Sequence, residues 1–241
     1  MDINQAKQAV REEVWSRLEH AAVVPPGVRG HIPDFIGAQE AAAHLASLTQ
    51  WQTSEVIKCN PDRAQLPVRT LALTENKLVY MAIPKIADVR PFYVLNPASL
   101  TAPIIEAATS TGASVHAPKT AIDDMQPVDM VICGSVAVNR KGVRIGKGAG
   151  YSDIEVALLF EANLIGPATT FVTTVHSLQV VADELPAAPH DFAVDFIITP
   201  EGIIECSPDR RITGIDWPSL SKDKIEAIPP LKHLITTKTD S

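Results

Sequence analysis

The chain has 241 residues, of which 46% are hydrophobic, and a formal net charge of −7. This length suffices for one large α/β domain with a sizeable core, and we interpret residues 1–241 as a single domain. The acidic balance argues against general nucleic-acid binding, which depends on clustered Lys and Arg. It is compatible with an anionic small molecule, because a local basic loop can bind one inside an acidic protein.

The sequence carries no sign of a membrane span or of a signal peptide. No apolar run approaches the roughly 18 residues of a membrane span, and residues 1–5 lack the basic start and apolar stretch of a signal peptide. Cys59 and Cys133 end apolar runs and are interpreted as buried thiols, and no cysteine spacing is typical of zinc. We therefore expect a cytoplasmic protein without nucleic-acid or membrane partners, either a monomer or a small homo-oligomer.

The first predicted helix covers residues 4–20, where Val10, Val14 and Leu18 recur at every fourth position. Lys7 and Arg11 also lie four apart and therefore share one face of this helix. On the residues alone, this pair is interpreted as a solvated basic edge of the helix.

Short elements separated by turns follow, and we predict a loop over 23–37, a helix over 38–49, a strand over 55–59, a loop over 85–98 and a helix over 99–112. Two apolar runs, 70–73 and 78–83, stand among these elements. Residues 75–77 join the two runs, which suits a hairpin or an adjacent pair of strands.

A glycine-rich run at residues 143–155 organises the rest of the chain. An apolar run over 128–138 predicts a buried strand before it, and residues 153–163 predict a helix after it. Strand, glycine-rich loop and helix form an arrangement that binds phosphate, because glycines let the backbone approach an anion and the helix N-terminus supplies free N–H groups. Arg144 and Lys147 add full positive charges to the loop.

The residues at the start of that helix have two interpretations. Ser152, followed by Glu155 three residues later, has the form of a capping box, in which both residues serve only to begin the helix. Asp153 differs, because a carboxylate beside a phosphate loop is repulsive unless a cation stands between them. Magnesium is therefore a natural inference at Asp153.

The last part of the chain adds strands and then changes character. A β-branched run over 169–176 predicts a buried strand, and Asp195 stands at the mouth of another apolar strand. From about residue 209 the chain becomes polar and interrupted by proline, which we interpret as a peripheral segment or tail. Alternating strands and helices indicate an α/β fold with a mostly parallel sheet and helices on both faces. Ligands of such sheets lie at the carboxyl ends of strands, where the glycine-rich loop falls.

The glycine-rich loop resembles the signature of the 5-formyltetrahydrofolate cyclo-ligase family, which carries an arginine, a Gly-basic-Gly-x-Gly run, two tyrosines and an aspartate. All of these except the second tyrosine are present, at Arg144, 146–150, Tyr151 and Asp153. Ser152 replaces the second tyrosine, which resembles the branch of methenyltetrahydrofolate synthetase domain-containing proteins. The Lys-x-x-x-Arg of the first helix and a late Asp-x-x-Val-Asp pattern also match the family.

The resemblance implies a three-layer α/β/α fold and an ATP- and Mg²⁺-dependent conversion of 5-formyltetrahydrofolate to 5,10-methenyltetrahydrofolate. ATP phosphorylates the formyl oxygen, N10 attacks the activated carbon, and phosphate leaves. The expected substrate is therefore a reduced folate or a related small molecule, and the expected cofactors are ATP and Mg²⁺. The resemblance implies catalytic roles for Arg144, Lys147 and Tyr151. It implies ATP binding by Lys7, Arg11, Arg144, Gly146, Lys147, Gly148, Gly150 and Tyr151.

Asp153 and Asp195 each match a family aspartate that binds metal, so we predict that they converge on one magnesium ion. The alternative is that Asp153 caps a helix while Asp195 pairs with a nearby Lys or Arg. Because Ser152 departs from the family pattern, two other functions stay open. One is a paralogue that acts on another substrate, with a suspected link to thiamine metabolism, and the other is a non-catalytic nucleotide-binding module.

Overall fold

An eight-stranded sheet forms the centre of the computed structural model, which describes residues 2–208 and 214–239. Its strands follow the order β11-β10-β8-β5-β1-β2-β3-β4. Their bounds are β1 (Val56–Cys59), β2 (Leu78–Ala82), β3 (Phe92–Leu95), β4 (Lys119–Thr120), β5 (Met130–Cys133), β8 (Thr170–Thr174), β10 (Phe196–Thr199) and β11 (Gly202–Glu205). The strands from β10 to β2 run parallel, and antiparallel pairs close both edges.

A second, three-stranded sheet connects the end of β5 to the glycine-rich loop. It has the order β7-β6-β9, with β6 at Ala137–Asn139, β7 at Arg144–Ile145 and β9 at Val180–Val181. Because β6 and β7 pair antiparallel, the chain turns back before it enters the loop. This turn brings Arg144 close to the end of β5, where the site described below is built.

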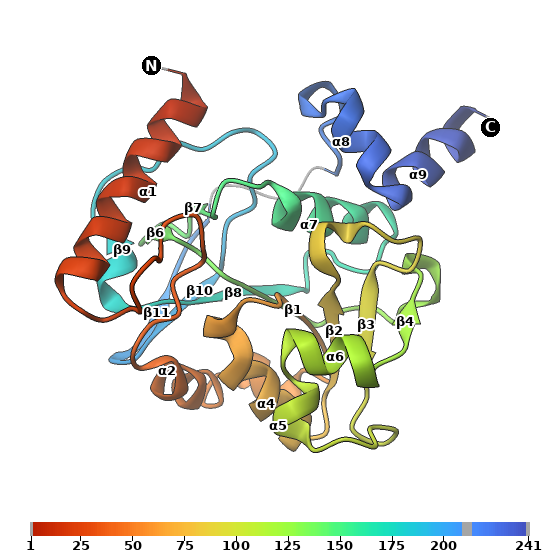
Figure 1. Ribbon diagram of the computed structural model, residues 1–241, viewed down its shortest axis with the longest axis horizontal. Coiled ribbons are helices and arrows are strands. Elements are labelled where there is room, and N and C mark those ends of the chain that lie inside the picture. Colours follow the sequence, from red (N-terminus) through yellow and green to blue (C-terminus); the bar gives the residue numbers. More distant parts are fainter. Residues whose placement is uncertain (1, 209–213, 240–241) are drawn as a thin grey trace.

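Helices lie on both faces of the main sheet (Figure 1). They are α1 (Ile3–His20), α2 (Ala38–Leu45), α3 (Thr49–Thr53), α4 (Leu66–Thr74), α5 (Ile104–Ala107), α6 (Ser110–His116), α7 (Tyr151–Glu161), α8 (Lys222–Ala227) and α9 (Pro229–Thr239). Single 3₁₀ turns are η1 (Arg63–Gln65), η2 (Pro84–Ile86), η3 (Ile122–Asp124), η4 (Ser177–Gln179) and η5 (Trp217–Ser219). The arrangement confirms the predicted three-layer α/β/α fold with a mostly parallel sheet.

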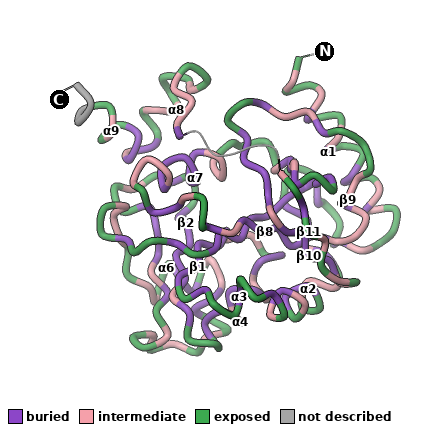
Figure 2. The backbone as a smooth tube through the Cα atoms, turned by 180° about the vertical axis from the view of Figure 1, so that it is seen from behind, coloured by how far each residue is buried: buried purple, intermediate pink, exposed green. Residues whose placement is uncertain are grey.

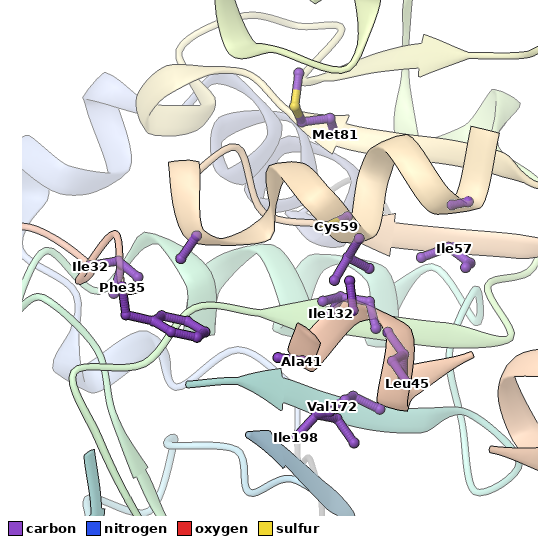
Figure 3. Packing of buried hydrophobic residues seen from close by; sticks show 14 of the residues in the cluster. Ile32, Phe35, Ala41, Leu45, Ile57, Cys59, Met81, Ile132, Val172 and Ile198 are labelled. Atoms are coloured by element: carbon purple, nitrogen blue, oxygen red, sulfur yellow. The ribbon is translucent and has the colours of Figure 1, made fainter. Parts of the chain in front are cut away.

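The two faces of the sheet follow from the alternation of side chains along each strand. In β1, Ile57 and Cys59 belong to the core beneath α2 and α4, whereas Val56 belongs to the core on the α7 face. Figure 3 shows the first of these cores, and Figure 2 shows that the central strands are buried along their length. Lys58 shares the α7 side with Val56, so a charged side chain enters that layer.

The strands β1 and β5 are neighbours that lead the chain to opposite sides of the sheet. After β1 the chain passes through α4 to β2, and after β5 it passes through α7 to β8. A crevice forms at the carboxyl ends of two parallel strands whose connections diverge in this way, and such a crevice is where α/β sheets bind ligands. The glycine-rich loop lies at this crevice.

The described part of the C-terminal segment packs on the outer side of α7 (Figure 1). Ile228 and Leu231 are fully buried in a cluster with Ile154 and Leu158 of α7. This part is therefore a peripheral segment, the first of the two predicted alternatives, and not a tail, since apolar side chains hold it against the fold. Residues 209–213, where the segment was predicted to begin, lie outside the described residues.

The predicted pair of strands between residues 70 and 83 is wrong in its first half. Residues 70–73 lie in α4, which begins with Pro67 in its first turn, and only β2 is a strand. A short apolar run fits a buried strand or a buried helix equally well, because its periodicity does not separate the two.

Three other predicted elements have different boundaries in the structure. The loop expected over 85–98 contains β3. The helix expected over 99–112 consists of α5 and α6, with Pro103 immediately before α5 rather than inside it. The strand expected over 128–138 is interrupted between β5 and β6, and its residues are nevertheless buried on both sides of the break.

Cys59, Cys133 and Cys206 are buried free thiols, as predicted for the first two. Among the described residues, no helix combines the length and the apolar character needed to cross a membrane.

Candidate functional site

A cavity of about 530 Å³ opens at the carboxyl ends of β1 and β5. Helix α1, the chain just after β1, β2 and β5, and the glycine-rich loop all contribute to its wall. The wall includes the glycine-rich loop and several charged or polar side chains: Lys7, Arg11, Asn60, Asp62, residues 144–153, Glu155 and Asp191. Every residue predicted to bind ATP therefore lines one cavity, although α1 and the loop are far apart in sequence.

The loop owes its shape to two glycines with left-handed backbone conformations. Gly148 has a φ of 101° and Gly150 a φ of 71°, a region that other residues rarely adopt. A Cβ at Gly148 would also lie 3.3 Å from the guanidinium carbon of Arg11. The left-handed backbone therefore favours glycine at this position, and a side chain there would press on Arg11.

Helix α7 begins at Tyr151 with Gly150 as its N-cap residue. Ser152 lies inside the first turn, so the predicted capping box of Ser152 and Glu155 is wrong. The N-cap glycine has no side chain that could occupy the first N–H groups of α7. These groups can therefore donate to an anion, which the partial positive charge of the helix end also favours.

Arg144 is almost fully buried, with 4% of its surface exposed, and it makes several contacts. It donates to Ser135 Oγ at 3.3 Å, to Gly134 O at 3.3 Å and to Asp153 Oδ1 at 3.2 Å. Its guanidinium also lies 4.4 Å from the ring centre of Phe192. Arg144 therefore links the end of β5 to the start of α7, in addition to placing a charge beside the loop.

The charge of Arg144 is maintained by its surroundings. Burial alone would lower its pKa, because a charge is less stable away from water. The Cys133 sulfur and the carboxylates of Asp153 and Asp191 outweigh this effect and raise the pKa. The guanidinium consequently stays protonated.

Lys7 and Arg11 project from α1 into the site, so the predicted solvated edge is wrong. Their exposed fractions are 9% and 8%. Lys7 Nζ lies 2.5 Å from Asp191 Oδ2, and Arg11 Nε donates to the Gly146 carbonyl at 2.7 Å. Burial lowers the pKa of Arg11, and the charge of Asp191 offsets part of that shift.

Lys147 and Tyr151 lie at the more open side of the loop. Lys147 Nζ is 2.9 Å from Asp62 Oδ1, and 40% of the lysine side chain is exposed. The Tyr151 ring lies beneath the ammonium group of Lys224, which is 3.5 Å from the ring centre. A residue from the C-terminal segment therefore contacts the signature loop.

Two carboxylates on the cavity wall, Asp153 and Asp191, are of the chemical type that magnesium takes as protein ligands. Magnesium takes one or two protein carboxylates and completes its octahedron with phosphate oxygens and water. The described residues contain no group of three or more His, Cys, Asp or Glu side chains that could hold a metal ion. The site thus fits an ion that arrives with a polyphosphate better than one held by the protein alone.

A family model described as the 5-formyltetrahydrofolate cyclo-ligase family matches residues 3–200. The chain belongs to this family.

Curated relatives share the name methenyltetrahydrofolate synthase domain-containing protein. The Mus musculus protein is 36% identical over 236 residues, which are 95% of this chain and 63% of that protein. The Homo sapiens protein is 34% identical over 238 residues, which are 96% of this chain and 62% of that protein. The chain therefore spans less than two thirds of the length of these relatives.

Two further matches carry the name of the enzyme itself. The 5-formyltetrahydrofolate cyclo-ligase of Mycolicibacterium smegmatis is 38% identical over 77 residues, which are 32% of this chain and 36% of that protein. The NMR structure of Aquifex aeolicus 5,10-methenyltetrahydrofolate synthetase matches with a TM-score of 0.52 and 20% identity, covering 89% of this chain and 99% of that one. The structural match supports the fold of the cyclo-ligase family.

The predicted convergence of Asp153 and Asp195 on one ion is wrong. Asp195 precedes β10, and its Oδ2 accepts a hydrogen bond from the Phe171 N–H at 2.8 Å. Phe171 is the register partner of Val131, near the start of β5. Asp153, in contrast, accepts a hydrogen bond from Arg144, which itself contacts Gly134 just beyond the end of β5. At about 3.3 Å per residue the two levels differ by roughly 10 Å. In this cyclo-ligase family member, Asp191 lies at the loop instead.

A buried ion pair beneath the loop escaped the sequence analysis. Lys58 is 0% exposed, and its Nζ lies 2.5 Å from Glu155 Oε2 and 2.5 Å from Asn60 Oδ1. Asn60 Nδ2 in turn donates to Ser152 Oγ at 3.4 Å. The signal was a lysine within the apolar strand β1, since a buried charge needs a partner. The family loop and the central strand are joined through this pair.

Proposed function

We propose that this chain is an ATP- and Mg²⁺-dependent cyclo-ligase that converts 5-formyltetrahydrofolate to 5,10-methenyltetrahydrofolate. The observation that carries the proposal is the gathering of four cations on one cavity, beside a glycine-rich loop and a helix N-terminus. These cations are Lys7, Arg11, Arg144 and Lys147, and a fifth, Lys85, lines the same cavity just after β2. Phosphoryl transfer needs positioning and charge neutralisation more than it needs a covalent nucleophile, and such a site supplies both.

Three of the four cations divide into two groups by the partners they hold. Lys7 and Lys147 each meet a carboxylate, Asp191 and Asp62, which a phosphate oxygen can replace with another charge-assisted bond. Arg144 is fixed by buried contacts, so it supplies charge without changing partner. The two lysines are therefore the residues that we expect to bind the polyphosphate directly.

The carboxylates of Asp153 and Asp191 are the residues that would hold magnesium. When bound, the ion supplies further neutralisation of the phosphoryl group. An incoming polyphosphate releases Asp191 from Lys7, which leaves that carboxylate available. The exchange that binds phosphate would thus also prepare Asp191 as a metal ligand, while Asp153 stays bonded to Arg144.

In the proposed reaction, the formyl oxygen of the substrate takes the phosphoryl group and ADP leaves. N10 then attacks the activated carbon, loses its proton, and expels phosphate. The chain binds and orients the reacting groups through the loop N–H groups, Arg144 and Lys147. The cavity also extends past Asn60 to Ile83 and Ser110, which leaves room for the substrate on the side away from α1.

The test is ATP turnover with and without 5-formyltetrahydrofolate, together with direct detection of 5,10-methenyltetrahydrofolate by its absorbance. We expect folate-dependent turnover that Lys147→Ala strongly lowers. Lys141→Ala is the matched control, because Lys141 meets Glu184 on the surface, outside the cavity. Binding of ATP without any turnover would contradict the proposal and favour a non-catalytic nucleotide-binding module.

One observation favours a second function, an ATP-dependent reaction on another substrate. Ser152 stands where the family has a second tyrosine, and its hydroxyl belongs to the polar chain formed with Asn60, Lys58 and Glu155. A small residue in this place changes the shape of the cavity wall. Product formation that is absent with 5-formyltetrahydrofolate but present with another acceptor would select this second function.

A further inference from the structure

A second cavity, of about 370 Å³, adjoins the phosphate loop. It shares five wall residues with the first cavity: Asn4, Lys7, Gly150, Asp153 and His190. The two cavities therefore meet at the end of the loop where the proposed phosphate-binding groups lie. We call this second cavity the side chamber.

The C-terminal segment forms the outer wall of the side chamber. Ile215, Asp216, Leu220 and Lys224 line it, and all four lie beyond residue 200, where the family match ends. The segment is anchored by its own apolar cluster with α7, so its position does not depend on a ligand. This chain therefore carries a wall that the matched part of the family model does not describe.

Two polar contacts join that wall to the site. Lys224 Nζ donates to the Ala149 carbonyl at 2.7 Å, and the same group lies over the Tyr151 ring. On the other side, His190 Nδ1 lies 3.0 Å from Asp216 Oδ2. The wall consequently touches the loop and the region of Asp191, which are the two parts of the site that carry its charges.

The side chamber differs in chemistry from the loop cavity. Ile3, Ile154, Ala157, Ile215 and Leu220 give it an apolar lining, with polar groups at Asp216 and Ser219. Ligand pockets of this kind bind flat apolar groups and orient them through a few polar side chains. A nucleotide has the same two-part chemistry, with an anionic polyphosphate at one end and a heteroaromatic base on a ribose at the other.

We propose that the side chamber binds the base and ribose of the nucleotide whose phosphates lie on the loop, and that residues 214–224 are its outer wall. The proposal rests on the proposed function, because it assumes that a nucleotide polyphosphate occupies the loop. It adds a nucleoside subsite and assigns it to the C-terminal segment. Lys224 links the two subsites, since it contacts the loop from the chamber wall.

The test compares ADP and ATP with tripolyphosphate, which has the charges but no base or ribose. Leu220→Trp fills the chamber from the C-terminal wall, and Ile3→Trp fills it from α1. We expect each variant to weaken ADP and ATP binding by about tenfold or more and to leave tripolyphosphate binding unchanged. Calorimetry measures the affinities, and thermal melting selects variants that remain folded.

The outcomes separate the two proposals. Equal losses for ATP and tripolyphosphate, or no loss for ATP in a folded variant of either residue, would overturn the side-chamber assignment. Failure of the unchanged protein to bind ATP, ADP and tripolyphosphate would instead overturn the proposed function. Lys222→Ala is the control in the same C-terminal segment as Leu220, because Lys222 does not line the chamber, and it should bind ATP as the unchanged protein does.

Discussion

Two ion pairs beside the same loop differ in how deeply they lie. Lys58 and Glu155 lie beneath the loop with side chains 0% and 7% exposed, whereas Lys147 at the rim is 40% exposed and meets Asp62. A buried charge that loses its partner is costly, while an exposed one is stabilised by water. The comparison teaches that the lower pair holds the loop in place and that the rim pair is able to change partners.

The largest effect is expected from removing one member of the buried pair. Glu155→Ala leaves the Lys58 charge buried without its carboxylate and should lower the free energy of unfolding by about 3–5 kcal/mol. Denaturant unfolding measures it. Replacing both residues, as Lys58→Met with Glu155→Leu, should recover much of the loss. Glu184→Ala, at the surface pair with Lys141, is the control and should change little. A small effect of Glu155→Ala would refute the structural role of the pair.

The next largest effects, on ATP binding and on thermal stability, distinguish the roles of Arg144 and Lys147. Lys147→Ala should weaken ATP binding roughly 10- to 150-fold, because it removes a charge-assisted bond worth about 1.5–3 kcal/mol. Arg144→Ala should also weaken ATP binding, because it removes a positive charge from beside the loop. Only Arg144→Ala should also lower the melting temperature, because its contacts with Ser135 and Gly134 are buried. Calorimetry and thermal melting measure the two effects. Equal melting temperatures for both variants would show that Arg144 is as replaceable as the rim lysine.

A smaller effect is expected on the magnesium requirement of ATP binding. Asp191→Asn should raise the magnesium concentration needed for ATP binding, because the carboxylate lies in the cavity beside Lys7. Asp195→Asn should leave that concentration unchanged, since its carboxylate bonds the Phe171 N–H away from the loop. Titration of magnesium at fixed ATP measures both variants. A requirement raised only by Asp195→Asn would restore the original assignment and contradict the present one.

The smallest effect is a pH dependence of stability from a buried thiol beneath the site. Burial raises the pKa of Cys59 to about 11 from an ordinary value of 9.0. The unfolded chain therefore loses this proton first, so the thiol's contribution to stability is complete below pH 9.0 and is lost as the pH rises toward about 11. Melting temperatures across that range should fall less for Cys59→Ala than for the unchanged protein. Parallel curves would show that Cys59 contributes nothing.

The parts of the site that lie close together in sequence were predictable. The glycine-rich loop, its two cations and the helix after it follow one another within a few residues, and local chemistry was enough to predict them, although not the N-cap residue of the helix. The fold class followed from the alternation of strands and helices. The orientation of Lys7 and Arg11 was harder to predict from the sequence. Their spacing places both on one face of the helix, but it does not show whether that face contacts solvent or the rest of the protein.

The remaining errors came from contacts that local sequence does not encode. Lys58 and Glu155 are 97 residues apart in the chain, and Glu155 had a plausible local interpretation as part of a capping box. Asp191 and Asp195 belong to one short pattern, but Asp195 comes immediately before β10 and therefore lies at the edge opposite to the carboxyl ends. The position of Asp191 at the loop depends instead on the path of the chain before that strand, which the spacing between the two aspartates does not give.

The partnered cations of the loop have a consequence for ionic strength. Lys7, Lys147 and Arg144 each already face a carboxylate, and Arg11 is the one further cation among the four. The site is therefore close to neutral when seen from a distance, inside a protein whose net charge is −7. Long-range attraction of an anion depends on net charge and is screened by salt. The anion should accordingly associate with this site more slowly than with a site of high positive charge, and the association rate should change little with salt concentration.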